Sequence, residues 1–317
     1  MDRSHLIPLP VVLGPTGSGK SDLSLFIARA VGGEIVNCDS LQVYRGFDIG
    51  TAKLSKAERQ GIPHHLIDIV EPSGLFTAGD YARAAETVIR EISERGRTAV
   101  LVGGTGFYLR GLLEGLSPGP SRDSNLRARL EAREQRRPGS MHRLLMRLDD
   151  VSAARIHPND KNKTMRALEI RLLKGISLSS LFESGRIPLR DYFPIKIGLD
   201  PPREALYIKL NERARRMFYP DVTRESLLDE VRRLLATGVP SAAKPFESLG
   251  YTQALSVLEG RMSEEQALES TQIETRRYAK RQQTWFRKEQ GVHWIEGFGD
   301  EPRVRAEALA ILERAVI

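Results

Sequence analysis

The sequence predicts an α/β fold in which helices cover both faces of a doubly wound parallel sheet. Three observations carry this prediction: short apolar runs alternate with amphipathic helical segments, each run is continuous, and the first run leads into a glycine-rich loop. Continuous apolar runs are typical of strands that are buried on both faces. The 317 residues suffice for one or two domains, and no window approaches the roughly 18 apolar residues of a membrane span.

The first third of the chain shows the alternation most clearly. The elements expected there are strands over 9–13, 34–38 and 98–102 and helices over 21–31 and 78–94. The last strand follows a break at Gly96. Since strands and helices alternate, the strands are expected to pair in parallel, with the helices as crossover connections.

The remaining two thirds contain more helix. After Pro118 the composition becomes arginine-rich and helical up to about Glu183. The elements expected beyond it are strands over 195–199 and 292–295, helices between 203 and 288 with breaks near 219 and 238, and a closing helix over 302–316. The predicted organisation is a core over 1–120, continued by about 190–220 and 288–317, an arginine-rich helical insertion over 121–189, and a helical nucleic-acid-binding segment over 221–287.

The glycine-rich loop is the strongest single motif. It consists of Gly14, Pro15, Thr16, Gly17, Ser18, Gly19, Lys20 and Ser21, between an expected strand and an expected helix. Such a loop directs backbone N–H groups at phosphate oxygens, while Lys20 neutralises charge and the Ser21 hydroxyl can hold a magnesium ion. The fold class is therefore P-loop NTPase-like, and specifically nucleotide-kinase-like.

The carboxylates expected near this loop are unusually placed. P-loop NTPases hold magnesium also through an aspartate at the end of an apolar strand, but the run ending at Val102 is followed by Gly103, Gly104 and Thr105. Asp39 follows the second strand instead, where it could act as a base or cap a turn. Asp48 is a second candidate, farther from the strand end.

Basic residues concentrate in two segments. The net charge of the chain is +7; residues 121–147 contain eight arginines and three acids, and residues 275–288 contain six basic residues and no acid. Tyr278, Trp285 and Phe286 lie among the cations of the second segment, where aromatic rings can stack on bases. The competing interpretation is that Trp285 and Phe286 belong to the core of an amphipathic helix.

Several motifs in order resemble the tRNA dimethylallyltransferase family, in its bacterial form. They are the loop 14–21, the segments 39–44 and 48–53, His64 to Asp68, Val102 to Tyr108, Arg155 to Asp160, and Ala279 to Arg287. Gly17 stands where the family usually has alanine, and Leu54 where proline is common. The C-terminal zinc finger of eukaryotic relatives is absent, since Cys38 is the only cysteine.

The resemblance implies that the loop binds dimethylallyl diphosphate and that the prenyl group goes to the N6 amine of the adenosine 3′ of the tRNA anticodon. It implies three catalytic residues: Asp39 as the base, Thr105 near the reacting centre, and Arg213 on the diphosphate. By sequence alone, an arginine such as Arg213 on a polar helix face is usually just solvated. The residues implied or predicted to bind tRNA are Asp39, Ser40, Leu41, Gln42, Arg127, Lys163, Arg166, Lys280, Arg281, Gln282, Gln283, Thr284, Trp285, Phe286 and Arg287.

The expected cofactor is Mg2+, and the expected partners are dimethylallyl diphosphate and the tRNA anticodon stem-loop. We expect a cytoplasmic monomer with no membrane association. Three alternatives share the phosphate loop: a small-molecule P-loop kinase, an adenylate dimethylallyltransferase, and an RNA-binding switch regulated by a nucleotide. The arginine-rich segments favour tRNA, because a small substrate would not need them.

Overall fold

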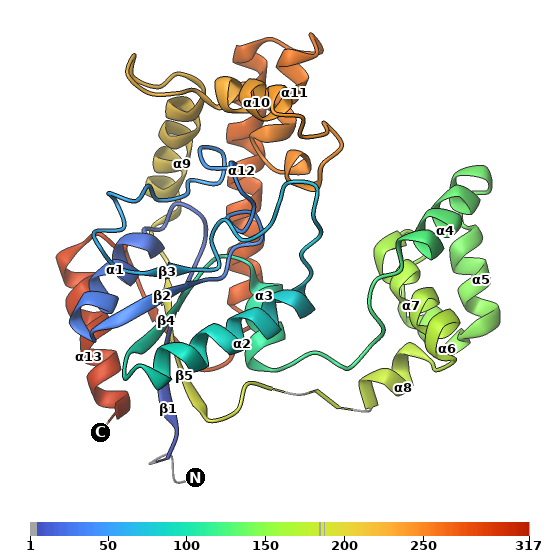
Figure 1. Ribbon diagram of the computed structural model, residues 1–317, viewed down its shortest axis with the longest axis horizontal. Helices are drawn as coiled ribbons and strands as arrows, with labels where there is room; N and C mark the ends of the chain where they lie inside the picture. The colour runs from blue at the N-terminus through green and yellow to red at the C-terminus, as the bar shows by residue number, and fades with distance from the viewer. Residues whose placement is uncertain (1–4, 184, 187, 317) are drawn as a thin grey trace. The chain divides into compact units, whose positions relative to one another are not determined.

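Six parallel strands form the central sheet of the part of the chain that the computed structural model describes, residues 5–183, 185–186 and 188–316. The strands are β1 (Ile7–Leu13), β2 (Gly33–Asn37), β3 (His64–His65), β4 (Thr98–Val102), β5 (Tyr192–Leu199) and β6 (Val292–Ile295). Their order is β3-β2-β4-β1-β5-β6 (Figure 1). Because β1 is central and β2 and β4 lie to one side of it, a phosphate loop after β1 and a carboxylate after β2 share the carboxyl edge of the sheet.

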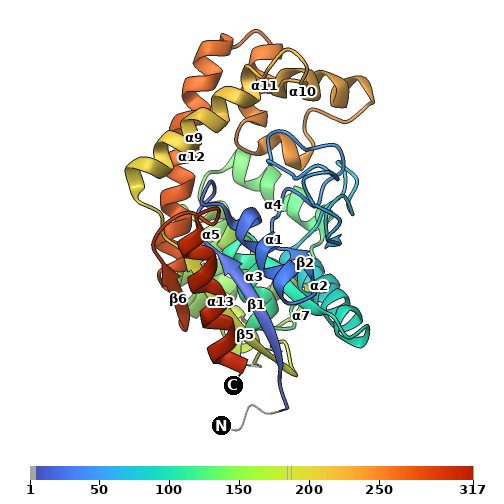
Figure 2. The same ribbon diagram turned by 90° about the vertical axis from the view of Figure 1, so that its left-hand side faces the viewer.

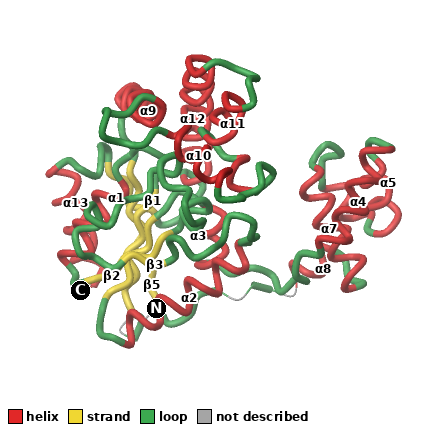
Figure 3. Tube along the Cα trace, turned by 45° about the horizontal axis from the view of Figure 1, so that its top comes forward, coloured by secondary structure: helices red, strands yellow, loops and turns green. Residues whose placement is uncertain are grey.

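Helices cover both faces of this sheet (Figure 3). Helices α1 (Lys20–Ala30) and α13 (Pro302–Val316) pack together on one face, and α2 (Ala78–Glu94) and α3 (Gly106–Leu113) pack together on the other. Val12, Ile35 and Ile197 are at most 1 % exposed between these layers. The doubly wound α/β prediction is therefore confirmed.

A second group of helices lies beyond the carboxyl ends of the strands (Figure 2). It consists of α9 (Arg203–Phe218), α10 (Leu227–Ala236), the short 3-10 helix Lys244–Glu247, α11 (Tyr251–Leu258) and α12 (Glu264–Phe286). Ser263 is the N-cap of α12. Its hydroxyl accepts the amide hydrogen of Gln266, and the side-chain oxygen of Gln266 accepts the amide hydrogen of Ser263. Since α12 contacts both α9 and α3, it joins this group to the sheet layer.

The chain divides into two compact units. The first comprises residues 1–113 and 189–317, and the second comprises 114–188. The second unit contains α4 (Ser124–Arg136), α5 (Ser140–Leu148), α6 (Asp150–Arg155), α7 (Lys161–Lys174) and α8 (Leu178–Glu183) around a core of its own. The expected insertion over 121–189 thus begins a few residues earlier, whereas the expected segment 221–287 belongs to the unit that contains the sheet.

Two elements differ from the sequence-based expectation. Strand β3 has two residues, too few to give a recognisable pattern, and α3 begins at Gly106, directly after the 103–105 turn. Of the helices described, none combines the length and apolar character that a bilayer crossing requires.

Candidate active site

The loop 14–21 connects β1 to α1 at the carboxyl edge of the sheet. Gly14, Gly17 and Gly19 have φ of 147°, 79° and 83°, which other residues rarely adopt. A Cβ on Gly19 would also lie 2.7 Å from the amide nitrogen of Gly299. Helix α1 starts without a side-chain cap, so the first N–H groups of the helix remain available to an anion.

Polar side chains of the loop lie close to the N-terminus of α1. The Ser18 hydroxyl is buried and has no hydrogen-bond partner among the described residues. The Nζ of Lys20 donates to the Pro15 carbonyl at 2.7 Å. Burial lowers the pKa of Lys20 to about 8, with Arg213 adding to the effect and Asp39 opposing it. Lys20 is therefore still mainly charged at pH 7, and a bound anion would stabilise that charge.

Arg213 reaches the same loop from α9. Its Nη2 donates to the Thr16 hydroxyl at 2.7 Å. The Arg213 side chain is half-buried, whereas Arg215 and Arg216 on the same helix are exposed. Burial lowers the pKa of Arg213, and the charge of Asp39 opposes that effect, but a guanidinium stays charged at any physiological pH. Of these three arginines, the structure brings Arg213 to the phosphate loop.

Asp39 follows β2 and belongs to a tight turn. Its Oδ1 accepts the amide hydrogens of Leu41 at 2.8 Å and Gln42 at 3.3 Å, so it does cap a turn as the alternative interpretation expected. Its Oδ2 accepts no hydrogen bond from the described residues. The charge of Asp39 raises the pKa of both Lys20 and Arg213. One oxygen thus orients the carboxylate, and the other is available to a proton.

Asp48 has a different environment. Its Oδ1 is 2.6 Å from the Nζ of Lys53, and that ammonium is 2.6 Å from Asp68 as well. The Lys53 side chain is 3 % exposed. Asp48 therefore compensates a buried lysine, and we retain Asp39 as the candidate base.

Thr105 connects the turn after β4 to the turn that carries Asp39. Its hydroxyl accepts from the Ser40 amide at 3.1 Å and lies 3.4 Å from the Ser40 hydroxyl. Its own amide donates to the Cys38 carbonyl at 3.2 Å. Among the described residues, the hydroxyl therefore contacts the residue next to Asp39 and not Asp39 itself. The side chain of Gln42 donates to the Thr51 carbonyl at 3.1 Å.

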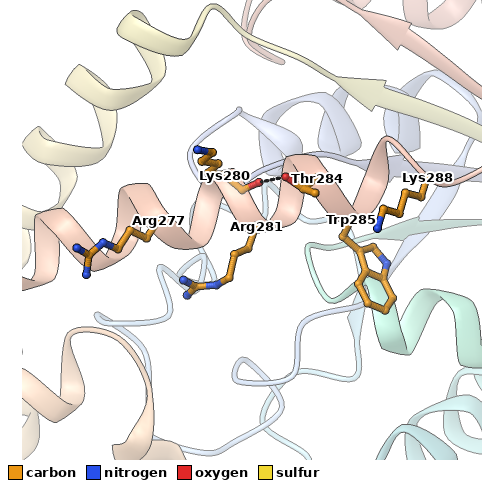
Figure 4. Close-up of a pocket in the computed structure, with 6 residues that line it drawn as sticks. All are labelled: Arg277, Lys280, Arg281, Thr284, Trp285 and Lys288. Carbon is orange, nitrogen blue, oxygen red and sulfur yellow. Dashed lines mark hydrogen bonds between the residues drawn. The ribbon is translucent and has the colours of Figure 1, made fainter. Parts of the chain in front are cut away.

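One face of α12 carries a basic pocket (Figure 4). The pocket has a volume of about 400 Å³ and is lined by Arg277, Lys280, Arg281, Thr284, Trp285 and Lys288. Arg281 and Trp285 project from the same side of the helix. Trp285 is 37 % exposed, and the guanidinium of Arg110 lies 4.6 Å from its ring centroid. An open pocket with cations and one aromatic ring suits a phosphate-bearing, base-bearing ligand.

The opposite face of α12 is buried. Gln282 is 6 % exposed and Phe286 is 1 % exposed, so we correct the predicted tRNA-binding set by leaving these two side chains out of it. Phe286 is a core residue, as the competing interpretation expected. Gln283 and Arg287 both bond to Asp200, at 3.1 Å and 3.4 Å. The buried positions recur every three or four residues, as expected for one face of a helix.

In the second unit, two arginines that were predicted to bind tRNA form ion pairs within the unit. Arg127 and Arg166 both bond to Glu169, at 2.8 Å and 2.7 Å, and Glu169 has a fully buried side chain. Burial alone would raise the pKa of Glu169, but hydrogen bonds from Arg127, the Asp123 amide and Arg166 outweigh it and hold that pKa at about 2. Lys163 is exposed and pairs with Asp160. Arg127 and Arg166 therefore brace this unit.

Sequence reasoning missed the anchor of the 48–50 segment. The Oε2 of Glu230 accepts the amide hydrogens of Asp48 at 3.1 Å and Ile49 at 2.9 Å. The hydroxyl of Tyr251 accepts from the Gly50 amide at 3.1 Å. Glu230 lies three residues after Leu227 and four before Leu234, on the apolar face of α10. This glutamate on an apolar helix face was the available signal, because a buried carboxylate needs donors.

These features define a class of protein. The fold is P-loop NTPase-like, and its phosphate loop faces a carboxylate after β2 and a helix with a basic pocket. The family model described as IPP transferase matches residues 42–289, and the chain belongs to this family.

Similar proteins extend this assignment over the whole chain. A tRNA dimethylallyltransferase from Solibacter usitatus is 56 % identical over 96 % of this chain and 97 % of its own length. The full-length tRNA isopentenylpyrophosphate transferase from Bacillus halodurans has a TM-score of 0.69 at 36 % identity, covering 97 % of both chains. A eukaryotic dimethylallyltransferase acting on tRNA has a TM-score of 0.80 at 26 % identity, covering 98 % of this chain and 80 % of that one.

Proposed function

We propose that the protein transfers a dimethylallyl group from dimethylallyl diphosphate to the N6 amine of the adenosine 3′ of the tRNA anticodon. The observation that carries this proposal is the pairing of a phosphate loop with Asp39, whose second oxygen is available to a proton. A phosphate loop alone would suit a kinase equally well. The names of the relatives supply the chemical identity of the transferred group and of the acceptor.

In this reaction the diphosphate is the leaving group. The allylic carbon–oxygen bond breaks as the N6–carbon bond forms, and negative charge grows on the departing diphosphate. The N–H groups at the start of α1, together with Lys20 and Arg213, are placed to stabilise that charge. Because the charge is larger in the transition state than in the substrate, this stabilisation accelerates the reaction.

Ser21 is the residue that would hold Mg2+. It lies half-exposed in the first turn of α1, and its hydroxyl bonds to no described residue. Among the described residues, no group of three or more histidine, cysteine, aspartate or glutamate side chains could hold a metal ion. Mg2+ bound here would take diphosphate oxygens and water among its other ligands, as is usual for this ion. A bound Mg2+ would supply charge neutralisation of the diphosphate.

The adenine amine is a poor nucleophile because its lone pair is delocalised into the ring. It must lose a proton as the new bond forms, and Asp39 accepts that proton. The Thr105 hydroxyl acts by fixing Ser40, and thereby the turn on which Asp39 sits. The two Oδ1 hydrogen bonds keep the carboxylate from rotating away from the phosphate loop.

The surface for tRNA is the exposed face of α12, with the turn 40–42 beside Asp39. Lys280, Arg281 and Arg287 contact phosphates, and Trp285 stacks on a base. In the second unit the exposed arginines of 121–147 and Lys163 bind the RNA backbone. The adenosine must leave its stack to reach Asp39, which costs a few kcal/mol that these contacts offset. The protein acts as a monomer in the cytoplasm, where tRNA is its substrate.

A labelled-substrate assay tests this function. Dimethylallyl diphosphate labelled in its prenyl group is incubated with the protein and either unmodified tRNA or AMP. Label in tRNA at the adenosine next to the anticodon is the expected result. Label in AMP alone would identify an adenylate dimethylallyltransferase, and phosphate transfer from ATP without prenyl incorporation would identify a kinase.

A further inference from the structure

Gln282 occupies a buried position on a helix whose other face is basic. Its neighbours Lys280 and Arg281 are exposed, whereas Gln282 is 6 % exposed. A buried carboxamide needs partners for both its oxygen and its NH2 group. These partners come from two loops that are distant in the sequence.

The oxygen Oε1 of Gln282 accepts the amide hydrogen of Thr16 at 2.8 Å, inside the phosphate loop. Its Nε2 donates to the carbonyl of Gly104 at 2.9 Å. One partner is a backbone donor and the other a backbone acceptor, so the carboxamide has one satisfactory orientation. A glutamate here could still accept from Thr16, but a carboxylate oxygen would face the Gly104 carbonyl.

Each of these loops carries part of the reaction. Thr16 bonds to Arg213, and Gly104 precedes Thr105, whose hydroxyl fixes the turn of Asp39. A Cβ on Gly104 would lie 2.4 Å from the Nε2 of Gln282, so the absence of a side chain at 104 permits the contact. The same Cβ would lie 3.8 Å from the Nζ of Lys20, so the bridge runs directly beside the phosphate site.

We propose that Gln282 is a positioning residue that sets the distance between the leaving-group site and the base. It holds the phosphate loop and the 103–105 turn in a fixed relation, on a helix whose outer face binds tRNA under the proposed function. This inference rests on the proposed prenyl transfer. It replaces the direct tRNA contact that was predicted for Gln282.

Two variants test the bridge, Gln282→Leu and Gln282→Glu. Both are expected to lower the single-turnover rate at saturating substrates by roughly a hundredfold, since small displacements of reacting groups have effects of this size. The affinity for tRNA is expected to stay within about twofold, because the side chain does not reach the surface. Gln282→Glu retains the hydrogen bond from the Thr16 amide but places a carboxylate beside the phosphate site, so it is expected to have the lower affinity for dimethylallyl diphosphate.

Gln272→Leu is the matched control. Gln272 lies on the same helix and donates to the Asn211 carbonyl at 3.2 Å, so its loss weakens helix packing without touching either loop. We expect a comparable fall in melting temperature and a single-turnover rate within about twofold of wild type. If Gln282→Leu fails to fold, Gln282→Glu measured under the same conditions decides the question.

Three outcomes would overturn the inference. A weaker tRNA affinity with an unchanged single-turnover rate would make Gln282 a tRNA contact. An unchanged rate and affinity would make the bridge irrelevant to the reaction, and rate losses equal to that of Gln272→Leu would make it a packing contact. If wild-type protein transfers no prenyl group to tRNA, the proposed function itself fails, and that result is distinct from these three.

Discussion

Two groups in this molecule combine one carboxylate with two cations, and they are built in opposite ways. In the second unit, Arg127 and Arg166 bond directly to the buried Glu169. In the first unit, Lys20 and Arg213 bond to the phosphate loop while Asp39 bonds to its own turn. The group around Glu169 satisfies its charges internally and braces helices. The group around Asp39 keeps its charges apart, which leaves cations for an anion and a carboxylate oxygen for a proton.

The largest expected effect comes from removing the proton acceptor, Asp39, from the candidate active site. Asp39→Asn keeps the size of the side chain and one acceptor oxygen for the turn but removes the proton acceptor. The single-turnover rate is expected to fall roughly a thousandfold while tRNA affinity is retained. Rapid-quench measurement with labelled dimethylallyl diphosphate checks this. Asp48→Asn is the control; if it instead causes the larger loss, Asp48 is the base.

Breaking the brace is expected to change stability rather than chemistry. Glu169→Gln leaves Arg127 and Arg166 without a counter-charge, which should lower the free energy of unfolding of the second unit by about 3 kcal/mol. The pKa of Glu169 is held at about 2, below its ordinary 4.5. The stabilisation is therefore complete above pH 4.5 and is lost as the pH falls towards 2.

Urea denaturation at several pH values measures both effects. Glu131→Gln, an exposed acid of α4, is the control and should change stability by less than about 0.5 kcal/mol. Equal stability of the Glu169→Gln variant and wild type at pH 7 would contradict the assignment of Glu169 as a brace.

The pH dependence of ligand affinity tests the role of Lys20 in the phosphate loop. Since burial lowers the pKa of Lys20 to about 8, its charge is present below that pH and is lost as the pH rises through it. The affinity for an unreactive dimethylallyl diphosphate analogue should therefore be constant near pH 7 and fall by up to about tenfold per pH unit above 8. Calorimetry of Lys20→Arg should give a flat profile, because arginine stays charged; a flat wild-type profile would be inconsistent with this role.

The smallest expected effect belongs to the outer face of α12. Arg281→Ala should weaken tRNA binding and reduce the slope of log K against log salt by about 0.7 to 0.9, the value for one phosphate contact. Filter binding at several salt concentrations measures the slope. Arg314→Ala removes an exposed arginine of α13 and should change neither quantity. Identical slopes for Arg281→Ala and wild type would remove Arg281 from the tRNA surface.

The sequence located the phosphate loop, Asp39 and most strands because each depends on consecutive residues. Helix 78–94 and strand 292–295 have the predicted bounds, since amphipathic and apolar runs mark them. Predictions from the sequence were weaker where several residues of one type were candidates for the same role. The sequence could not rank Arg213 above Arg215 and Arg216, could not decide whether Phe286 binds tRNA or belongs to the core, and did not predict that Gln282 would face inward.

By itself, then, the sequence determined an α/β protein with a P-loop motif and basic helices, because glycine conformations and apolar runs act over a few neighbouring residues. Tertiary structure alone decided which charges are paired and which are left for ligands. The bond between Gln282 and Thr16 spans 266 positions of the chain. Such a contact depends on how α12 packs against the sheet, and no local pattern encodes that packing.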